Sequence, residues 1–313
     1  MTKLKGKALK YGDTIGICAP SGALSEGQSL EMAVKGIEKL GFKTIVGKSC
    51  FESYGYLAGT DDIRADDLNF MFENPQVNAI VCLRGGYGTP RIIDKINYEI
   101  IKKNPKIFIG YSDITALLIS INQETGLVTF HGPMAASEEI MRNEKGMTLY
   151  SFLKNMTCRK PFEFLENPLN RQLKTYCSGK ACGEITGGNL SLLVSTLGSK
   201  YEVNTKGKIL FIEEINEYTY RVDRMLTSLR LAGKFDDCAG IIFGDFNCCD
   251  NEKDGYSLSL EQVINDVIGD IKKPVVTNFS SGHCKNMITI PFGTKCEINT
   301  ENNRIRILED NLY

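Results

Sequence analysis

Histidine is scarce in this 313-residue chain, in which only His131 and His283 are present. Imidazole is the usual base that activates a serine nucleophile near neutral pH, so such chemistry has two candidate bases here. His131 precedes Gly132 and Pro133, whereas His283 lies in the Ser- and Gly-rich sequence SSGHCKNM. Both follow segments expected to be strands, and loops at strand ends commonly carry function. A lone histidine is nevertheless more often structural or exposed than catalytic, so neither is assigned as the base from its own position.

Ser112 lies in a pattern that favours a nucleophile. In KIFIGYSDITALL, residues 106–118, an apolar segment ends at Gly110 and a helical pattern begins at Ile114. A strand–turn–helix of this kind holds a serine hydroxyl on a tight bend, and the first backbone N–H groups of the helix can stabilise an oxyanion. Ile114 stands where the G-x-S-x-G pattern has its second glycine. The alternative is that Ser112 only caps the helix.

A glycine-rich turn, RGGYG at residues 84–88, follows the apolar segment 77–83. Glycines let the backbone approach a ligand closely and present N–H donors to it. The turn is suited to complete an oxyanion hole for Ser112 or to cradle a phosphate. No G-x-x-x-x-G-K-[ST] sequence is present, and no G-x-G-x-x-G opens a helix with an acidic residue about 20 positions on. Nucleotide binding is therefore the weaker hypothesis.

Glu213 and Glu214 end the apolar segment KILFIEE, residues 208–214. Side chains alternate between the two faces of a strand, so only one of these carboxylates can orient a given histidine. Ser112, Glu213 and His283 occur in the order nucleophile, acid, base, as in α/β-hydrolases. The order is not decisive, because triads are known in three unrelated orders.

Short apolar segments alternate with helical patterns through the first half of the chain. The expected strands cover residues 15–19, 42–46, 77–83, 106–109 and 128–130, and the expected helices cover 25–40, a segment starting at 60, 90–96 and 114–123. This alternation predicts an α/β fold with a wound, mainly parallel sheet. In such sheets the loops after the carboxyl ends of the strands hold the chemistry.

A change of composition near residues 155–180, with Pro161, Pro168 and little periodicity, predicts a linker. We therefore expect an N-terminal α/β domain over 1–155, a linker over 156–180, and a smaller C-terminal α/β domain over 181–313. In the last domain, strands are expected at 209–213, 239–243 and 274–278, and helices at 221–231 and 260–268. The segments 295–299 and 304–308 are expected to pair as an antiparallel hairpin.

The overall charge argues against partners that need excess basic charge. Lys and Arg number 37 and Asp and Glu number 38, so the formal net charge is −1 and no nucleic-acid partner is expected. No apolar run approaches the roughly 18 residues of a transmembrane helix. The basic N-terminus has an apolar run of only about six residues, which is too short for a signal peptide. No membrane association is expected.

Eleven cysteines are scattered along the chain without a C-x-x-C pair. That spacing, together with two histidines, offers neither a disulfide framework nor a metal site. Several cysteines, such as Cys18 and Cys82, lie in apolar runs and are expected to be reduced and buried. We therefore expect a cytoplasmic protein with no metal and no cofactor.

Taken together, these segments resemble the LD-carboxypeptidase family of serine peptidases (family S66), which includes murein tetrapeptide carboxypeptidases and the microcin C immunity protein. The resemblance runs in order through almost the whole chain. It is carried by GDTIGICAPSG (12–22), LAGTDDIRADDLNFMF (57–72), AIVCLRGGYGTPRI (79–92), IFIGYSDITALL (107–118), FHGPM (130–134), GEITGGNLSLL (183–193), ILFIEEINEYTYRVDRML (209–226), GIIFGDF (240–246) and GHCKNMITIPFG (282–293).

The resemblance implies a Ser–Glu–His triad at the interface of two α/β domains, and commonly a homodimer. Ser112 is then the nucleophile, His283 the general base and Glu213 the orienting acid, with Glu214 as the alternative acid. The implied oxyanion donors are the backbone N–H groups of Asp113, Gly85 and Gly86. His131, in the FHGPM motif, becomes a structural or substrate-facing residue.

The implied activity is release of the terminal D-Ala of a muropeptide tetrapeptide, in peptidoglycan recycling, through an acyl-enzyme. The alternative within the family is a microcin C-type substrate such as an aminoacyl nucleotide, which is associated with aromatic stacking. The chain has no Trp, but five aromatic residues precede residue 183 and could stack: Tyr150, Phe152, Phe162, Phe164 and Tyr176. Residues that could contact the substrate or its carboxylate are Arg84, Tyr87, Arg221 and Arg224, although an arginine of this kind commonly makes a surface ion pair instead. A different class of function is a binding protein that keeps the fold without catalysis.

Overall fold

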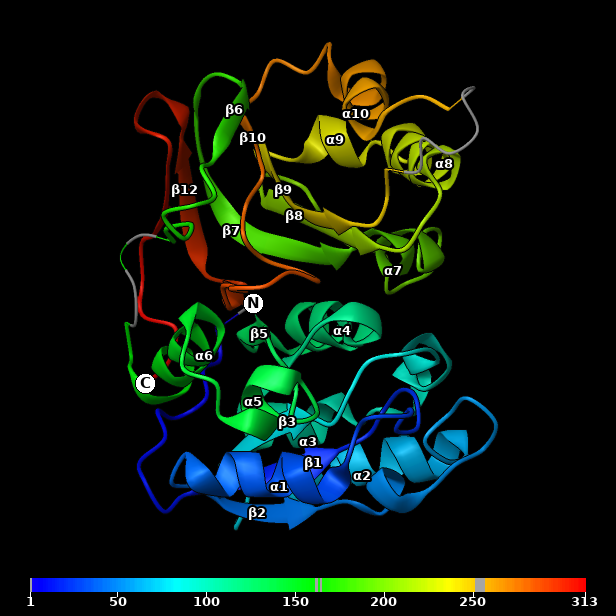
Figure 1. Cartoon of the computed structure of the whole chain (residues 1–313), viewed down its shortest axis with the longest axis vertical. Helices are drawn as coiled ribbons and strands as arrows, with labels where there is room; N and C mark the ends of the chain where they lie inside the picture. Colours follow the sequence, from blue (N-terminus) through cyan, green and yellow to red (C-terminus); the bar gives the residue numbers. More distant parts are fainter. Residues whose placement is uncertain (1, 161–162, 164, 251–256) are drawn as a thin grey trace. The chain divides into compact units, whose positions relative to one another are not determined.

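The computed structural model describes residues 2–160, 163, 165–250 and 257–313, and the chain divides into two compact units. The first unit comprises Met1–Pro161, Thr289–Gly293 and Asp310–Tyr313. The second comprises Phe162–Ile288 and Thr294–Glu309, and its main part runs from green through yellow to orange in Figure 1. Two short C-terminal segments thus belong to the first unit, so no single cut in the sequence separates the two units.

The described part of the first unit contains a six-stranded sheet in the order β11-β5-β4-β3-β1-β2. Its strands are β1 (Thr14–Cys18), β2 (Lys43–Val46), β3 (Ala79–Cys82), β4 (Ile107–Gly110), β5 (Thr129–His131) and β11 (Ile290–Phe292). All neighbours are parallel except β11, which pairs antiparallel with β5. Every residue of β3 and β4 is buried, as expected for central parallel strands. The predicted wound parallel sheet is confirmed.

Helices connect these strands, and several begin where the sequence offers a capping side chain. They are α1 (Leu30–Lys39), α2 (Asp61–Glu73), α3 (Tyr98–Lys103), α4 (Thr115–Thr125), α5 (Glu138–Arg142) and α6 (Met147–Thr157). Ser29 accepts a hydrogen bond from the backbone of Met32, so α1 starts later than the expected residue 25. The helix expected at 90–96 is instead two 3₁₀ turns, Thr89–Arg91 and Ile93–Lys95, and Asn97 then caps α3.

The described part of the second unit contains a seven-stranded sheet in the order β13-β12-β7-β8-β9-β10-β6. Its strands are β6 (Lys174–Cys177), β7 (Lys180–Asn189), β8 (Ile209–Ile215), β9 (Gly240–Asn247), β10 (Val275–Thr277), β12 (Lys295–Asn299) and β13 (Arg304–Ile307). The four central strands, β7 to β10, are parallel. The hairpin β12–β13 is antiparallel as predicted, and β6, which lies in the stretch expected as a linker, pairs antiparallel with β10.

The second sheet is accompanied by α7 (Leu190–Ser195), α8 (Thr219–Leu231), α9 (Lys234–Asp237) and α10 (Leu260–Ile268). A capping box formed by Ser259 and Gln262 begins α10. Phe211 and Phe279 are fully buried and meet edge to face, with ring centroids 6.3 Å apart. The fold class, α/β with a mainly parallel sheet and a second sheet that adds antiparallel strands, agrees with the prediction.

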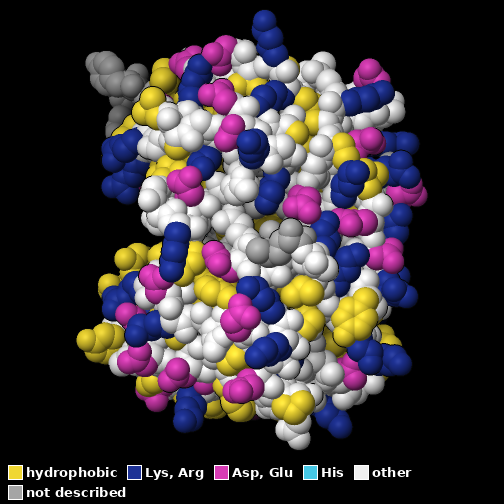
Figure 2. All heavy atoms as spheres, turned by 180° about the vertical axis from the view of Figure 1, so that it is seen from behind, with side chains coloured by type: hydrophobic (Ala, Val, Ile, Leu, Met, Phe, Trp, Pro, Cys, Tyr) yellow, Lys and Arg dark blue, Asp and Glu magenta, His cyan; other side chains and the backbone are white. Residues whose placement is uncertain are grey.

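The surface carries both signs of charge. Figure 2 shows Lys and Arg side chains interspersed with Asp and Glu side chains over the face in view. This mixture matches the formal net charge of −1 and provides no broad field that would steer a charged ligand. Within the described residues, no helix has the length and apolar character that crossing a membrane requires.

Candidate active site

Ser112 lies on the turn between β4 and α4 with a backbone φ of +62°. It is the first residue of a 3₁₀ turn, Ser112–Ile114, which continues directly into α4. The position before this turn is Tyr111 and the position before α4 is Ile114, so Ser112 is the N-cap residue of neither helix. A non-glycine residue with positive φ is strained, and such strain is typical of a nucleophile held on a strand–helix turn.

Gly85 closely approaches this serine. A Cβ at position 85 would lie 2.9 Å from Cβ and 3.1 Å from Oγ of Ser112, which is too close for a side chain. Gly86 adopts a φ of +126°, and a Cβ there would lie 3.2 Å from the Cα of Gly22. The glycine-rich turn is therefore needed for its backbone and lies directly beside Ser112, as an oxyanion-hole role requires.

Asp113 braces three loops at the carboxyl ends of neighbouring strands. Its buried carboxylate accepts hydrogen bonds from Ser21 Oγ at 2.6 Å, after β1, and from the backbone N–H of Thr89 at 2.9 Å, after β3. Thr89 Oγ1 also donates to the Asp113 carbonyl. Burial raises the pKa of Asp113, although these hydrogen bonds oppose the rise. Neither Ser21 nor Thr89 was predicted to have a role from its sequence; each is a small polar residue shortly after an apolar strand, which is the only signal the sequence offers.

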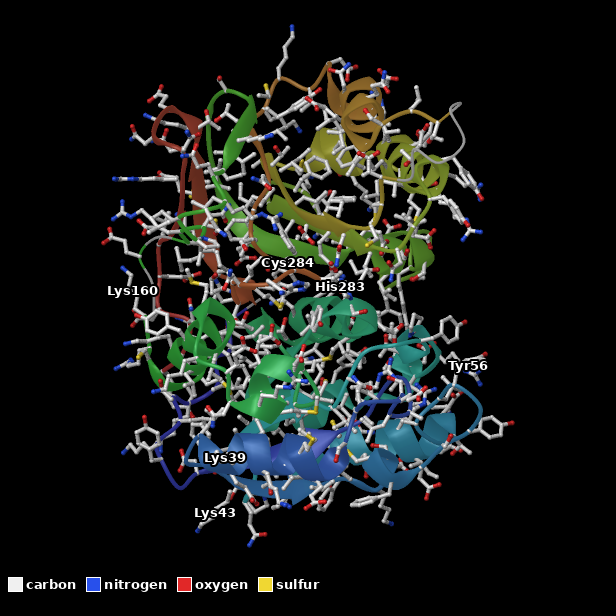
Figure 3. All side chains as sticks on the ribbon, in the orientation of Figure 1. Lys39, Lys43, Tyr56, Lys160, His283 and Cys284 are labelled. Carbon is white, nitrogen blue, oxygen red and sulfur yellow. The ribbon has the colours of Figure 1, made fainter. Side chains whose placement is uncertain are left out.

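His283 and Glu213 form a hydrogen-bonded pair in the second unit. Glu213 is fully buried near the end of β8, and its Oε2 lies 2.7 Å from Nδ1 of His283 in the loop after β10. Gly282 makes this approach feasible, because its φ is +109° and a Cβ there would lie 2.7 Å from the same oxygen. Figure 3 shows His283 and its neighbour Cys284 on that loop.

The electrostatic environment favours the protonated form of His283. Burial alone lowers the pKa of this imidazole, but the negative charge of Glu213 and the hydrogen bond to it act in the opposite direction. Glu214 and Asp245 add smaller effects of the same sign, and the pKa ends above the ordinary value of 6.5. An imidazole with a carboxylate on Nδ1 has the orientation and the stabilised imidazolium that a general base needs.

Glu214 has a different set of partners. Its carboxylate accepts hydrogen bonds from Asn189 Nδ2 at 2.8 Å and from the backbone N–H and Oγ of Ser191, at 2.8 and 2.7 Å, at the start of α7. Burial raises its pKa. Of the two glutamates that the sequence left open, the structure brings Glu213 to His283 and directs Glu214 to α7.

The other candidate residues of the first unit have separate environments. His131 is fully buried and packs between the rings of Tyr111 and Phe292, with centroid distances of 6.0 and 5.6 Å. This packing favours the structural interpretation of His131 over a substrate-facing one. Tyr87 is 57% exposed and meets the ring of Tyr56, a surface residue labelled in Figure 3, edge to face at 5.4 Å.

The three candidate arginines differ in their contacts. Arg84 is partly buried and its Nη1 donates to the Ala23 carbonyl at 2.7 Å. Arg221 forms an ion pair with Glu217 at 3.4 Å, and its guanidinium lies over the ring of Tyr218. Arg224 lies 5.7 Å from the ring centroid of Tyr220. These contacts hold Arg221 and Arg224 on the exposed side of α8.

Among the aromatic candidates for stacking, Phe152 is fully buried and Tyr150 is 52% exposed, both on α6. Tyr176 donates to Asn265 Oδ1 at 2.7 Å. Phe162 and Phe164 lie outside the described residues. All eleven cysteines are free thiols, and six of them are buried. In the part of the chain that the structure describes, no three His, Cys, Asp or Glu side chains gather in a way that would hold a metal ion.

The first α/β unit carries a serine on a strained strand–helix turn, and the second carries a paired histidine and glutamate. These residue types are those of a serine hydrolase. Comparison with known families is more specific. The family described as LD-carboxypeptidase N-terminal domain matches residues 15–132, and the corresponding C-terminal domain matches residues 182–298. The chain belongs to the LD-carboxypeptidase family, and it is a hydrolase of the peptidase class.

Relatives fall on both branches of this family. The chain is 45% identical to a probable murein peptide carboxypeptidase of Bacillus subtilis, over 95% of this chain and 92% of the relative. It is 31% identical to the microcin C7 self-immunity protein of Escherichia coli, over 97% of this chain and 95% of the relative.

Solved structures show the same division. A structure of the microcin C7 self-immunity protein with aspartyl sulfamoyl adenosine matches with a TM-score of 0.89 and 31% identity, covering 99% of this chain and 100% of that chain. A muramoyltetrapeptide carboxypeptidase from Oxalobacter formigenes matches with a TM-score of 0.80 and 25% identity, covering 96% and 99%. The comparisons support a carboxypeptidase and do not distinguish the two substrate classes by fold.

Proposed function

We propose that this protein is a serine LD-carboxypeptidase that releases the terminal D-Ala of muropeptide tetrapeptides, with Ser112 as nucleophile, His283 as base and Glu213 as orienting acid. The observation that carries the proposal is the 2.7 Å contact between His283 Nδ1 and Glu213 Oε2, because it leaves Nε2 as the nitrogen that can accept a proton. The left-handed backbone of Ser112 and the close approach of Gly85 support its role as nucleophile.

In the proposed mechanism, His283 Nε2 takes the proton of Ser112 Oγ as the oxygen attacks the carbonyl carbon of the last peptide bond. Glu213 holds the Nδ1–H tautomer and stabilises the imidazolium that forms. The carbonyl oxygen becomes an oxyanion, which the N–H groups of Asp113 and the Gly85-Gly86 turn would stabilise. Each well-placed donor is worth about 3 kcal/mol in the transition state.

The intermediate then breaks its carbon–nitrogen bond. His283 returns its proton to the leaving nitrogen, so D-Ala departs as a neutral amine and the acyl group stays on Ser112. A water molecule, deprotonated by the same imidazole, then attacks the ester carbon. The bond from that carbon to Ser112 Oγ breaks, the imidazolium returns its proton to Oγ, and the shortened peptide leaves. The mechanism requires Ser112 Oγ, carried by the first unit, to come within about 2.6–3.2 Å of His283 Nε2, carried by the second.

The choice of substrate follows the relatives. The muropeptide assignment is favoured by the 45% identity to a probable murein peptide carboxypeptidase. The second candidate is an aminoacyl-nucleotide-like substrate, favoured by the TM-score of 0.89 to the microcin C7 self-immunity protein. The absence of Trp from the chain weighs slightly against a site that stacks on a nucleobase.

Mass spectrometry of defined substrates tests the assignment. The panel contains muropeptide tripeptide, tetrapeptide and pentapeptide, together with aspartyl sulfamoyl adenosine. The proposal predicts loss of one D-Ala from the tetrapeptide and no change in the other two peptides. Cleavage of the sulfamoyl adenosine without cleavage of the tetrapeptide would transfer the assignment to the second candidate.

A further inference from the structure

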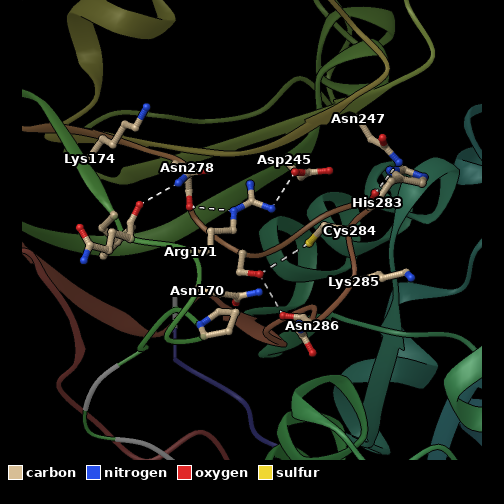
Figure 4. A pocket seen from close by; sticks show the side chains of 14 residues that line it. Asn170, Arg171, Lys174, Asp245, Asn247, Asn278, His283, Cys284, Lys285 and Asn286 are labelled. Atoms are coloured by element: carbon tan, nitrogen blue, oxygen red, sulfur yellow. Dashed lines mark hydrogen bonds and ion pairs between the residues drawn. The ribbon is translucent and has the colours of Figure 1, made fainter.

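A polar cavity of about 790 Å³ lies in the second unit, and His283 is one of its lining residues. The segment from Pro168 to Lys174 forms one wall, and the ends of β9 and β10 together with the loop that carries His283 form the others (Figure 4). Pockets of about 300–1,000 Å³ are typical of sites that hold small molecules. The D-Ala leaving group has only six non-hydrogen atoms, so this cavity has room for a larger part of a substrate.

The walls of the cavity are held together by charge and by hydrogen bonds. Arg171 forms an ion pair with Asp245 at 2.8 Å, and its Nε donates to the Asn278 carbonyl at 3.1 Å. The two charged side chains are only 22% and 18% exposed. Asn247 Nδ2 donates to the His283 carbonyl at 3.0 Å. The cavity is therefore preorganised, and Asp245, the one carboxylate among its described lining residues, is already neutralised by Arg171.

Two further cations line the cavity without such a partner. Lys174 and Lys285 make no ion pair within the described residues. Figure 4 shows them on opposite sides of the Arg171 guanidinium. The lining thus has an excess of positive charge, whereas the surface in Figure 2 mixes both signs. A local excess of this kind attracts an anionic group.

The remaining polar lining is dominated by side-chain amides, which belong to Asn170, Gln172, Asn247, Asn278 and Asn286. An amide offers both donors and acceptors, which matches the backbone of a peptide. The chemistry of the cavity therefore fits a peptide segment that carries a free carboxylate.

We propose that this cavity is a subsite for a free carboxylate of the peptide substrate other than the carboxylate of the D-Ala leaving group. The inference rests on the proposed function and adds a specificity determinant to it. A γ-linked glutamyl residue supplies such a group, because the linkage leaves its α-carboxylate free. The lysines provide the charge, and the amides of Asn170, Gln172 and Asn286 pair with the neighbouring peptide groups.

The test compares two tetrapeptides that differ only in whether this carboxylate is free or converted to an amide. The double variant Lys174→Glu/Lys285→Glu reverses both cavity charges, and Lys206→Glu/Lys272→Glu makes the same change at exposed positions of the second unit outside the cavity. We expect the cavity variant to raise KM for the free acid about tenfold and to leave KM for the amide unchanged, with any change in kcat equal for the two peptides. The control variant should match the wild type with both peptides.

Equal effects of the cavity variant on the two peptides, or no effect on either, would overturn the subsite. The neutral pair Lys174→Gln/Lys285→Gln gives a smaller shift in the same direction and replaces the charge reversal where that variant does not fold. Both lysines are exposed, so the neutral pair removes no buried contact.

Calorimetric binding of the tripeptide product to the wild-type protein separates the subsite from the proposed function. Binding of the free acid about tenfold tighter than the amide, abolished in the cavity variant, supports the subsite even where no D-Ala is released. Equal binding of acid and amide overturns it even where D-Ala is released. Adenosine monophosphate is the second probe. If the cavity variant loses binding of the nucleotide but binds the peptide as the wild type does, the cavity is a phosphate site and the carboxylate subsite is overturned.

Discussion

Oε2 of Glu213 lies 2.7 Å from Nδ1 of His283, and Gly282 between β10 and His283 is the residue that permits this distance. The contact joins a buried carboxylate on a central strand to an imidazole on a loop. It determines which ring nitrogen carries a proton and raises the pKa of His283 against the effect of burial. The behaviour of variants at both residues follows from this one contact.

Glu213→Gln should reduce kcat by about 10⁴, because an amide can donate to Nδ1 and so stabilise the wrong tautomer, and because it no longer balances the imidazolium. Steady-state release of D-Ala measures the effect. Glu214→Gln is the matched control, because it alters the hydrogen bonds to Asn189 and Ser191 instead. It should lower the melting temperature but reduce kcat far less than Glu213→Gln does. The reverse pattern would make Glu214 the orienting acid.

The pH profile should reflect His283. Only the neutral imidazole can accept the proton of Ser112, so kcat/KM should rise with pH through a midpoint above 6.5, and activity should fall as the pH drops through that value. In Glu213→Gln the charge that raises the pKa is gone while burial, which lowers it, remains. The midpoint of the residual activity should therefore move to lower pH, and a midpoint that stays in place or rises would refute this assignment.

Gly85→Ala should lower kcat by about tenfold or more, because the new Cβ would lie 2.9 Å from Cβ of Ser112 and force the serine or the turn to shift. Gly146→Ala is the control, since a Cβ there meets no atom within 4 Å and its φ of −178° suits any residue. Comparable loss of activity in both variants would show that the effect at Gly85 is general destabilisation. Wild-type activity in Gly85→Ala would remove the glycine-rich turn from the site.

Asp113→Ala should destabilise the first unit by about 1–3 kcal/mol, because it leaves the buried Ser21 hydroxyl and Thr89 N–H without their acceptor. Chemical denaturation measures the loss. Ser21→Ala removes only one of the donors and should cost less. Equal stability of Asp113→Ala and the wild type would show that the three loops do not depend on this carboxylate.

The sequence predicted those parts of the fold whose signal is local. Apolar runs such as 79–82 and 107–110 could be assigned as buried parallel strands, and the turn at Ser112 could be assigned as a candidate nucleophile turn. The antiparallel strand β11 could not be assigned to the first unit, because it pairs with β5 about 160 residues earlier in the chain and nothing near Pro291 encodes that partner.

The same limit applied at the site. Alternation along β8 showed that only one of Glu213 and Glu214 could reach a given histidine, but which one depends on the loop that carries Gly282. The role of Asp113 also depends on distant partners, since Ser21 and Thr89 lie in other loops of the sheet. The cavity lined by Lys174 and Lys285 joins a stretch expected to be a linker with the His283 loop, and a linear pattern carries no signal for that.

The central claim is that Ser112 is the nucleophile that releases D-Ala. Its most direct test is the rate of D-Ala release from a muropeptide tetrapeptide by Ser112→Ala, compared with the wild type and with folding verified by the melting temperature. We predict a loss of at least about 10³-fold with an unchanged melting temperature. A folded Ser112→Ala protein that releases D-Ala within tenfold of the wild-type rate would contradict it.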